Sequence, residues 1–385
     1  MRGGVAYRVG LIVLVLLLTG VAIFVVRPRE FLLTYCAVGP FVASLLGMAW
    51  FRRPALRNSF LVLASVSLVS GLLDPITYFT NRPVVQAEGT WNNQYHYLWD
   101  ANLGIALPPN VAARAYKFTD HALVYDVTYT TDANGHRKTM GSTDASADNV
   151  IFMGCSFTFG EGVQDSETLP QQFSDQAGRK YNVVNFGVST FGVHQPLRSM
   201  ELGQLTPILT GGKRYIVYTG IPGHAQRAAA IGLRGPSYGL QADGSVKYLG
   251  QTQSFWQVFA VAIANRSLFL RTFVVIPLVS GSAPDAVPLY VALVKRAGEV
   301  AREKYQAKFI LVFWDDPGSQ DAADITAAFD KAKISYVKVS AILPDFQHDD
   351  YKYRLSRVDA HPNALADHLI GSYLAQHLDD IPPQP

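Results

Sequence analysis

The first eighty residues are dominated by long runs of apolar positions. Val9–Val26 and Phe31–Phe51 contain no charged residue, and Asn58–Phe79 contains only Asp74. A helix needs roughly 20 apolar residues to cross the hydrocarbon core of a bilayer. Such a helix satisfies its own backbone hydrogen bonds, as lipid requires. The pattern therefore predicts three transmembrane helices within residues 1–80.

A cleaved secretory signal peptide is the competing interpretation of the first run, because Arg2 and Arg8 precede it. The run is longer than the roughly 7–15 apolar residues of a usual signal sequence, and no small-residue cleavage site follows it. The second run begins after only four residues, 27–30. We therefore favour three spans.

The orientation of the three helices follows from the arginines in the short loops, because the side richer in Lys and Arg is cytoplasmic. One side carries the N-terminus and the second loop, with Arg2, Arg8, Arg52, Arg53 and Arg57. The other side carries Arg27, Arg29 and Arg82. The count predicts a multi-pass protein of the inner (cytoplasmic) membrane. The chain from about residue 81 onward then lies on the periplasmic or extracellular side.

Residues 81–148 predict a small β-rich extension. Leu123–Thr130 alternates in polarity and is followed by Asn134-Gly135. Asn-Gly supplies the positive φ angles of a tight turn between twisted strands, so we expect a hairpin or a small β-region here.

From Asn149 onward, short continuous apolar runs alternate with helical stretches, a pattern typical of a parallel sheet buried on both faces. The predicted strands are Val150–Met153, Val183–Phe186, Tyr215–Tyr218, Phe309–Phe313 and Tyr336–Val339. The predicted helices are Glu167–Gly178, Gln195–Leu205, Val287–Tyr305, Ala322–Ala332 and Asn363–Leu378. Right-handed crossovers then give a three-layer α/β/α domain over residues 149–385.

Residues 223–284 interrupt this alternation. The interval contains Asp243-Gly244, which predicts a hairpin turn, and the apolar stretch Phe255–Leu278 with Trp256, Phe259, Phe269 and Phe273. We interpret it as an insertion that packs in the core. A lid, a substrate wall and a membrane-contacting helix are the alternatives.

Composition excludes several functions. The net charge of +3 over 385 residues and the absence of a basic block argue against nucleic-acid binding. Cysteine and histidine show no zinc-like spacing, and Cys36 and Cys155 are not obvious disulfide partners. We therefore expect neither a metal nor another cofactor.

Candidate chemistry begins where the first predicted strand of the α/β domain ends in Gly154-Cys155-Ser156, with Gly160 and Gly162 beyond. This pattern exposes a hydroxyl at the carboxyl edge of the sheet. A serine needs a base to act as a nucleophile, normally a histidine held by a carboxylate. Asp359-Ala360-His361 offers both, just before a helix whose start is marked by Asn363.

At these positions the chain resembles the SGNH (GDSL-like) hydrolases, in particular membrane-anchored envelope-polysaccharide esterases and O-acetyltransferases. Gly154–Gly162 is similar to the family's Gly-Asp-Ser block, Val184–Val188 to its second block, and Asp359–Asn363 to its C-terminal Asp/His block. The resemblance implies a flavodoxin-like fold. It also implies that Ser156 is the nucleophile, His361 the base and Asp359 the orienting acid, with the N–H groups of Ser156 and Gly187 stabilising the oxyanion.

The chain departs from the family pattern at three places. Cys155 replaces the aspartate of Gly-Asp-Ser. Asp359 stands two residues before His361 rather than three, so Asp349 or Asp350 could serve instead. The third block lacks its asparagine after Tyr215–Tyr218, and His224 or Gln226 could donate to the oxyanion in its place. Asn185 is interpreted as a turn former.

The expected function is a serine-dependent ester hydrolase or O-acyl (acetyl) transferase that acts outside the cytoplasm on an envelope or exported polysaccharide. The expected partners are the membrane, an acylated carbohydrate and, for a transferase, a separate membrane acyl-donor protein. Trp91, Tyr97 and Trp99 could stack on sugar rings or pack in the core. The alternative is a non-catalytic carbohydrate-binding or scaffold protein on the same fold.

Overall fold

The computed structural model describes residues 2–26, 31–80, 85–90, 97–119, 122–229, 235–252, 262–275 and 286–384. These residues form two compact units. One comprises Met1–Val84 with Ser254–Ser280, and the other comprises Val85–Gln253 with Gly281–Pro385. The β-rich extension therefore belongs to the same unit as the α/β sheet, and part of the insertion belongs to the helical unit.

The helical unit contains α1 (Arg2–Val26), α2 (Leu32–Trp50) and α3 (Pro54–Thr80). Among the described residues, these three helices are long and apolar enough to cross a membrane. Large apolar side chains such as Leu17, Val62 and Val69 point outward on them. Outward apolar side chains suit a lipid environment, as the sequence predicts.

Inside this unit, a hydroxyl of α2 satisfies a backbone carbonyl of α3. Pro75 has no N–H, so the carbonyl of Gly71, four residues earlier, has no helical donor. The hydroxyl of Thr34 on α2 donates to that carbonyl at 2.8 Å. The two helices are joined there by a hydrogen bond in an apolar environment, where an unpaired carbonyl is costly.

Asp74 on α3 binds a segment of the insertion through hydrogen bonds. Its carboxylate is fully buried and accepts hydrogen bonds from the Leu33 N–H (2.9 Å), the Ser267 hydroxyl (2.6 Å) and the Phe269 N–H (3.0 Å). Ser267 caps the short helix α9 (Leu268–Leu270), which continues into a π-helical turn, η2 (Arg271–Val275). Of the four interpretations of the insertion, this placement favours a membrane-contacting helix over core packing. Trp256 and Phe259 lie outside the described residues.

In the second unit, five parallel strands of the described chain form one sheet in the order β12-β11-β8-β6-β7. They are β6 (Asn149–Gly154), β7 (Asn182–Gly187), β8 (Arg214–Gly220), β11 (Lys308–Phe313) and β12 (Val337–Lys338). The predicted fold class, a three-layer α/β/α domain with about five parallel strands, is confirmed. The order reverses at β6, and open α/β sheets bind ligands beyond the carboxyl ends of the strands at such a point.

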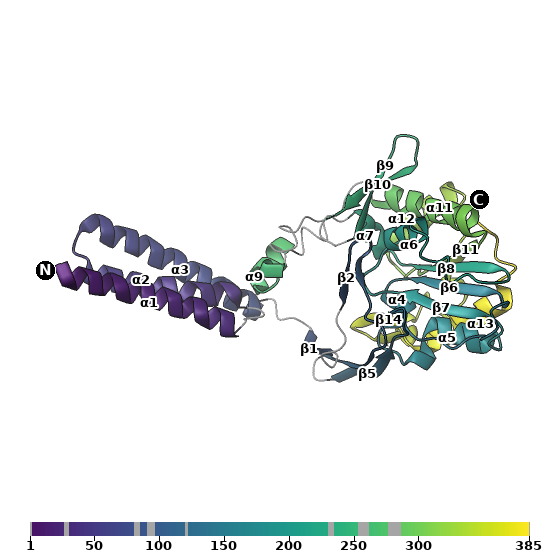
Figure 1. Ribbon diagram of the computed structural model, residues 1–385, viewed down its shortest axis with the longest axis horizontal. Helices are drawn as coiled ribbons and strands as arrows, with labels where there is room; N and C mark the ends of the chain where they lie inside the picture. Colours follow the sequence, from purple (N-terminus) through teal and green to yellow (C-terminus); the bar gives the residue numbers. More distant parts are fainter. Residues whose placement is uncertain are drawn as a thin grey trace. The chain divides into compact units, whose positions relative to one another are not determined.

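Helices cover both faces of this sheet (Figure 1). One face carries α5 (Leu169–Gln176) and α13 (Ala364–His377), and the other carries α6 (His194–Glu201), α7 (Gly223–Ala229), α11 (Ala286–Tyr305) and α12 (Gln320–Lys331). Each face has its own apolar core, and both meet on the buried side chains of β6. Burial on both faces explains why the strands are continuous apolar runs.

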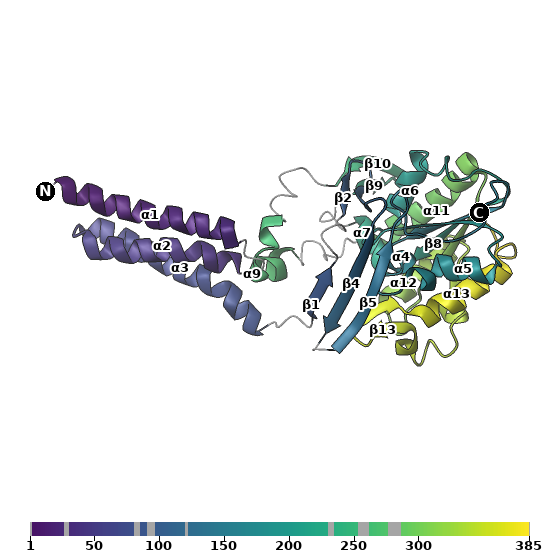
Figure 2. The ribbon, with the colours of Figure 1, turned by 60° about the horizontal axis from the view of Figure 1, so that its bottom comes forward.

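The extension forms an antiparallel sheet of β1 (Val85–Thr90), β4 (Ala112–Thr119) and β5 (Ala122–Thr130), in which the long strands β4 and β5 lie side by side (Figure 2). A short hairpin, β2 (Leu98–Asp100) with β3 (Gly104–Ala106), precedes β4. Strand β5 pairs with the strand before it, whereas Asn134-Gly135 forms a separate turn that leads to Arg137. The turn predicted at Asp243-Gly244 joins β9 (Pro236–Leu240) to β10 (Val246–Gln251).

Candidate active site

The proposed nucleophile follows the central strand directly. Strand β6 ends at Gly154, and Ser156 begins the single-turn helix α4 (Ser156–Phe159). The N–H groups at the start of a helix have no partner within the helix. Ser156 is therefore presented at the carboxyl edge of the sheet with its own amide uncommitted to α4.

His361 reaches Ser156 from the other end of the chain. It lies on β14 (Asp359–Pro362), which pairs antiparallel with β13 (Arg354–Ser356). Asn363 caps the following helix α13 by accepting a hydrogen bond from the Ala366 N–H at 3.1 Å, so the helix starts where the sequence predicts. The cap and the strand pairing fix the short segment that carries the histidine.

The three residues suggested by the sequence are joined by hydrogen bonds. His361 Nε2 lies 2.8 Å from Ser156 Oγ, and His361 Nδ1 lies 2.6 Å from Asp359 Oδ1. Asp359 Oδ1 also accepts the His361 backbone N–H at 3.1 Å. The two-residue spacing thus suffices, because residues two apart on the extended strand β14 point to the same side. Asp350 pairs with Arg354 instead of His361.

Lys117 is a fourth residue in this series of interacting side chains. Its place here could not be identified from the sequence. Its ammonium lies 2.8 Å from Asp359 Oδ2, and both side chains are largely buried. It comes from β4 of the extension. On that strand a lone lysine looks like an ordinary solvent-facing position, and no local signal distinguishes it.

The charges around the histidine set its proton affinity. Burial lowers the pKa of His361, but the hydrogen bond to Asp359 and the negative charges of Glu161 and Asp359 outweigh burial, so its pKa lies above the ordinary value. Burial would raise the pKa of Asp359, yet its contacts with His361 and Lys117 hold that pKa well below the usual range. Asp359 is therefore an ionised carboxylate hydrogen-bonded to the His361 ring.

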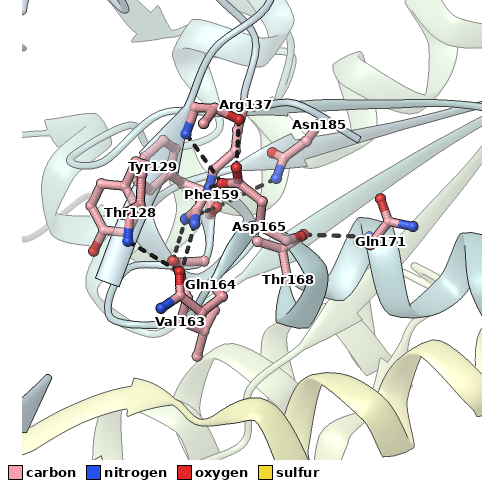
Figure 3. Close-up of polar contacts among 12 residues, drawn as sticks. Thr128, Tyr129, Arg137, Phe159, Val163, Gln164, Asp165, Thr168, Gln171 and Asn185 are labelled. Atoms are coloured by element: carbon pink, nitrogen blue, oxygen red, sulfur yellow. Dashed lines mark hydrogen bonds and ion pairs between the residues drawn. The ribbon is translucent and has the colours of Figure 1, made fainter. Parts of the chain in front are cut away.

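The turn after α4 is held by a buried arginine (Figure 3). Arg137 donates to the carbonyl oxygens of Phe159 (3.0 Å), Gly160 (2.5 Å) and Val163 (2.7 Å), and its Nε lies 2.8 Å from Asp165 Oδ1. Its guanidinium also lies over the rings of Tyr129 and Phe159, 4.2 and 4.7 Å from their centroids. The network fixes the loop that follows the nucleophile.

The amide of Gly187, which the resemblance assigns to the oxyanion, has an acceptor inside the protein. Its N–H donates to Asn185 Oδ1 at 3.0 Å, and a Cβ at position 187 would lie 2.4 Å from the Phe159 nitrogen. Asn185 is buried and also donates to the Thr158 carbonyl at 3.0 Å. Glycine is required here for the close approach of β7 to α4, and the structure gives its amide an internal acceptor.

His224 also lies away from the open site. It is fully buried on α7, where its Nδ1 is 2.5 Å from the Tyr218 hydroxyl and its ring packs near Tyr290. Burial, with the nearby Arg227 and His194, lowers its pKa well below the usual value. A neutral core histidine explains this position, and a role as oxyanion donor is not supported.

The turn beyond β7 borders the triad more closely. The Ser189 hydroxyl donates to Glu161 Oε2 at 3.0 Å, and Glu161 faces His361. Thr190 follows in an exposed position with φ of 76°, a backbone conformation that residues other than glycine rarely adopt. Such outliers cluster at ligand-binding sites.

A cavity of about 400 Å³ lies beside the edge strand β7. It is lined mainly by apolar residues of the β2–β3 hairpin, the end of β7 and the segment after α6, with His136 at its wall. Its lining does not include Ser156, His361 or Asp359. Trp99 is exposed and does not line it, and Trp91 lies outside the described residues.

The fold and the geometry define a doubly wound α/β domain with a serine–histidine–aspartate arrangement at its switch point. No family model matches the sequence, and no curated protein does.

Solved structures similar to this chain include that of a putative lipolytic protein of the G-D-S-L family from Desulfitobacterium hafniense. It shares 14% identity over 59% of this chain and 98% of its own, with a TM-score of 0.34. An arylesterase from Agrobacterium tumefaciens, also described as putative, shares 12% identity over 61% of this chain and 100% of its own, with a TM-score of 0.35. A carbohydrate acetylesterase from Sinorhizobium meliloti shares 8% identity over 60% and 99%, with a TM-score of 0.31.

Proposed function

We propose that this chain is a membrane-anchored serine esterase or O-acyltransferase of the SGNH type. The observation that carries the proposal is the continuous hydrogen-bonded chain from Ser156 Oγ through His361 to Asp359, with separations of 2.8 and 2.6 Å. Hydrogen-bond reach between a nucleophile and a base, with a third group orienting the base, is the geometry that nucleophilic catalysis requires.

The mechanism follows from these contacts. Ser156 Oγ attacks the ester carbonyl as its proton passes to His361 Nε2, and Asp359 stabilises the imidazolium that forms. His361 then gives the proton to the leaving alcohol oxygen, and Ser156 remains acylated. Water releases the acid in an esterase, whereas a sugar hydroxyl takes the acyl group in a transferase. Both reactions share the covalent step.

For the oxyanion we assign one donor to the Ser156 N–H and the second to the amides of the Ser189–Thr190 turn. Gly187 is already paired with Asn185, and the unusual backbone of Thr190 lies in the exposed turn beside the triad. A donor aimed at the developing charge contributes on the order of 3 kcal/mol to transition-state stabilisation.

The proposed substrate class rests on the proposed anchor. Three helices long and apolar enough to cross a membrane support a membrane-tethered site, and the arginine distribution in their loops favours a catalytic unit on the periplasmic or extracellular side. We therefore propose an acylated envelope or exported polysaccharide as the substrate. As a transferase, the chain would need a separate membrane protein to supply the acyl group.

The test compares full-length protein in detergent micelles with its Ser156→Ala variant on p-nitrophenyl acetate. We expect the variant to lose nearly all activity, by about 10⁴-fold or more. Equal rates for the two proteins would refute the proposed enzymatic function and favour the second candidate function. That candidate is a non-catalytic carbohydrate-binding protein, favoured only by the internally paired Gly187 amide. The O-acetyl content of envelope glycans from cells lacking the protein separates the two reactions: it rises if the protein is an esterase and falls if it is a transferase.

A further inference from the structure

Glu161 places a second carboxylate beside the catalytic histidine. Its Oε2 lies 3.7 Å from His361 Nε2, the same ring nitrogen that meets Ser156 Oγ. Asp359 lies on the opposite nitrogen, Nδ1. His361 Nε2 is the atom that takes the serine proton and returns it to the leaving alcohol, so Glu161 stands on the side where that alcohol must lie.

The position of Glu161 is built into the backbone. Gly160 and Gly162 flank it with φ of 81° and 85°, and the Glu161 N–H donates to the Ser156 carbonyl at 3.0 Å. Only glycine adopts such angles without strain. Arg137 fixes the carbonyl of Gly160 just before it. The backbone of Glu161 is therefore held close to Ser156.

The hydrogen bond from Ser189 uses only part of the acceptor capacity of the Glu161 carboxylate. The Ser189 hydroxyl donates to Oε2 at 3.0 Å, and about a fifth of the side chain stays accessible, 22%. An ionised carboxylate has about four acceptor positions. It retains acceptor positions for a donor that arrives with the substrate.

A carboxylate at this place opposes part of the chemistry, since it repels the oxyanion that forms on the substrate carbonyl oxygen when Ser156 attacks. Its negative charge also favours the protonated form of His361, in keeping with the raised pKa of that residue. Raising the proton affinity of the base lowers activity at mildly acidic pH. A residue with these costs is expected to make a compensating contact with the substrate.

We propose that Glu161 binds the alcohol part of the ester by accepting a hydrogen bond from a hydroxyl next to the reacting oxygen. The centre then selects neutral, polyhydroxylated alcohols such as sugars over alcohols that lack a neighbouring hydroxyl. This assignment rests on the proposed esterase or transferase function. During the reaction the proton moves between Ser156, His361 and the alcohol oxygen, and Glu161 takes no part in the transfer.

The test uses two esters of nearly equal size, 2-hydroxyethyl acetate and n-propyl acetate, with full-length protein in micelles and acetate release as the signal. Wild type should prefer the hydroxyl-bearing ester. Glu161→Gln should lower kcat/KM for that ester by about 10-fold, the effect of losing a hydrogen bond to a charged group, and change n-propyl acetate far less. Glu303→Gln, an exposed carboxylate on α11, is the matched control and should leave the preference intact.

A second readout separates binding from a structural role. Glu161→Gln should move the acid limb of the kcat/KM profile for n-propyl acetate to lower pH, because the negative charge beside His361 is gone. Glu161→Asp keeps the charge but moves it back by one methylene. The acid limb of its kcat/KM profile should therefore stay near the wild-type pH, whereas most of the preference for the hydroxyl-bearing ester should be lost.

The outcomes distinguish the two proposals. An active wild type without preference for the hydroxyl ester, or an equal loss on both esters in Glu161→Gln with an unmoved acid limb, overturns the role of Glu161 alone. A wild type inert towards both esters and p-nitrophenyl acetate overturns the proposed function, and the role of Glu161 with it.

Discussion

Replacing Arg137 with methionine tests the structural support of the site. Methionine keeps an apolar stem but has no donor, so the carbonyls of Phe159, Gly160 and Val163 lose their partner, and Asp165 loses its ion pair. Arg137 itself is almost fully buried, at 1% exposure. The change therefore leaves several polar groups without partners in the interior.

The magnitude follows from that list of lost partners. A buried acceptor left without a donor costs about 1–3 kcal/mol, and breaking a buried ion pair costs about 3–5 kcal/mol. These costs do not add fully, because Asp165 is partly exposed and turns to water. We expect a loss of about 3–5 kcal/mol, which lowers the Tm of a domain of this size by roughly 6–20 °C.

The assay is thermal unfolding of the full chain in micelles, followed by near-ultraviolet circular dichroism. Arg137→Lys should fall between wild type and Arg137→Met, because one ammonium cannot replace a planar fork with several donors. The control is Arg114→Met, which removes an exposed arginine from its pair with Asp126 and should leave the Tm unchanged. If Arg137→Met unfolds within roughly 1 °C of wild type, the reasoning about unpaired carbonyls is wrong.

Two further substitutions test the charges of Lys117 and Asp74. Lys117→Met removes a positive charge near His361, so the pKa of His361 rises further and the acid limb of kcat/KM moves to higher pH. The exposed Lys247→Met is its control, and a limb that moves to lower pH contradicts the assignment. Asp74→Ala leaves the donors that reach it from α2 and α9 without an acceptor, at a cost of about 2–3 kcal/mol of local stability. Trypsin should then cut within residues 262–275 several-fold faster in micelles, and equal cleavage rates would count against the contact.

The parallel sheet could be predicted from sequence because its strands are buried on both faces. Predicted Val150–Met153 is observed as Asn149–Gly154, and predicted Phe309–Phe313 as Lys308–Phe313. Strand β12 is the exception, since predicted Tyr336–Val339 shortens to Val337–Lys338. Only these two residues pair with β11, and the chain turns into a 3-10 helix from Val339 onward.

The residues around the triad show where a sequence pattern stops being informative. Ser156 and His361 are marked by local signals, namely the flanking glycines and the helix cap at Asn363. Lys117 and Arg137 are not, because a cation on or after an amphipathic strand normally faces solvent. Only the packing of the extension against the catalytic loop turns these two side chains inward.

Gly187 shows that one residue type at one position can have two physical explanations. The resemblance to the second SGNH block implied that its amide faces the substrate. A glycine at a strand end is equally explained by close packing, and the short distance from position 187 to Phe159 selects that explanation. The pattern identified the residue type that the position requires, whereas its physical reason depends on a neighbour from another element.

The residues of the candidate active site come from three separate segments of the chain. Ser156 and Glu161 follow β6, His361 and Asp359 lie on β14, and Lys117 comes from β4 of the extension. Lys117 neutralises the buried Asp359 carboxylate, which otherwise would be a costly charge to bury beside a single histidine. Arg137 in turn holds the loop that carries Glu161. The extension is therefore part of the catalytic unit in an electrostatic sense, and the smallest piece of chain with a complete centre must begin before β4.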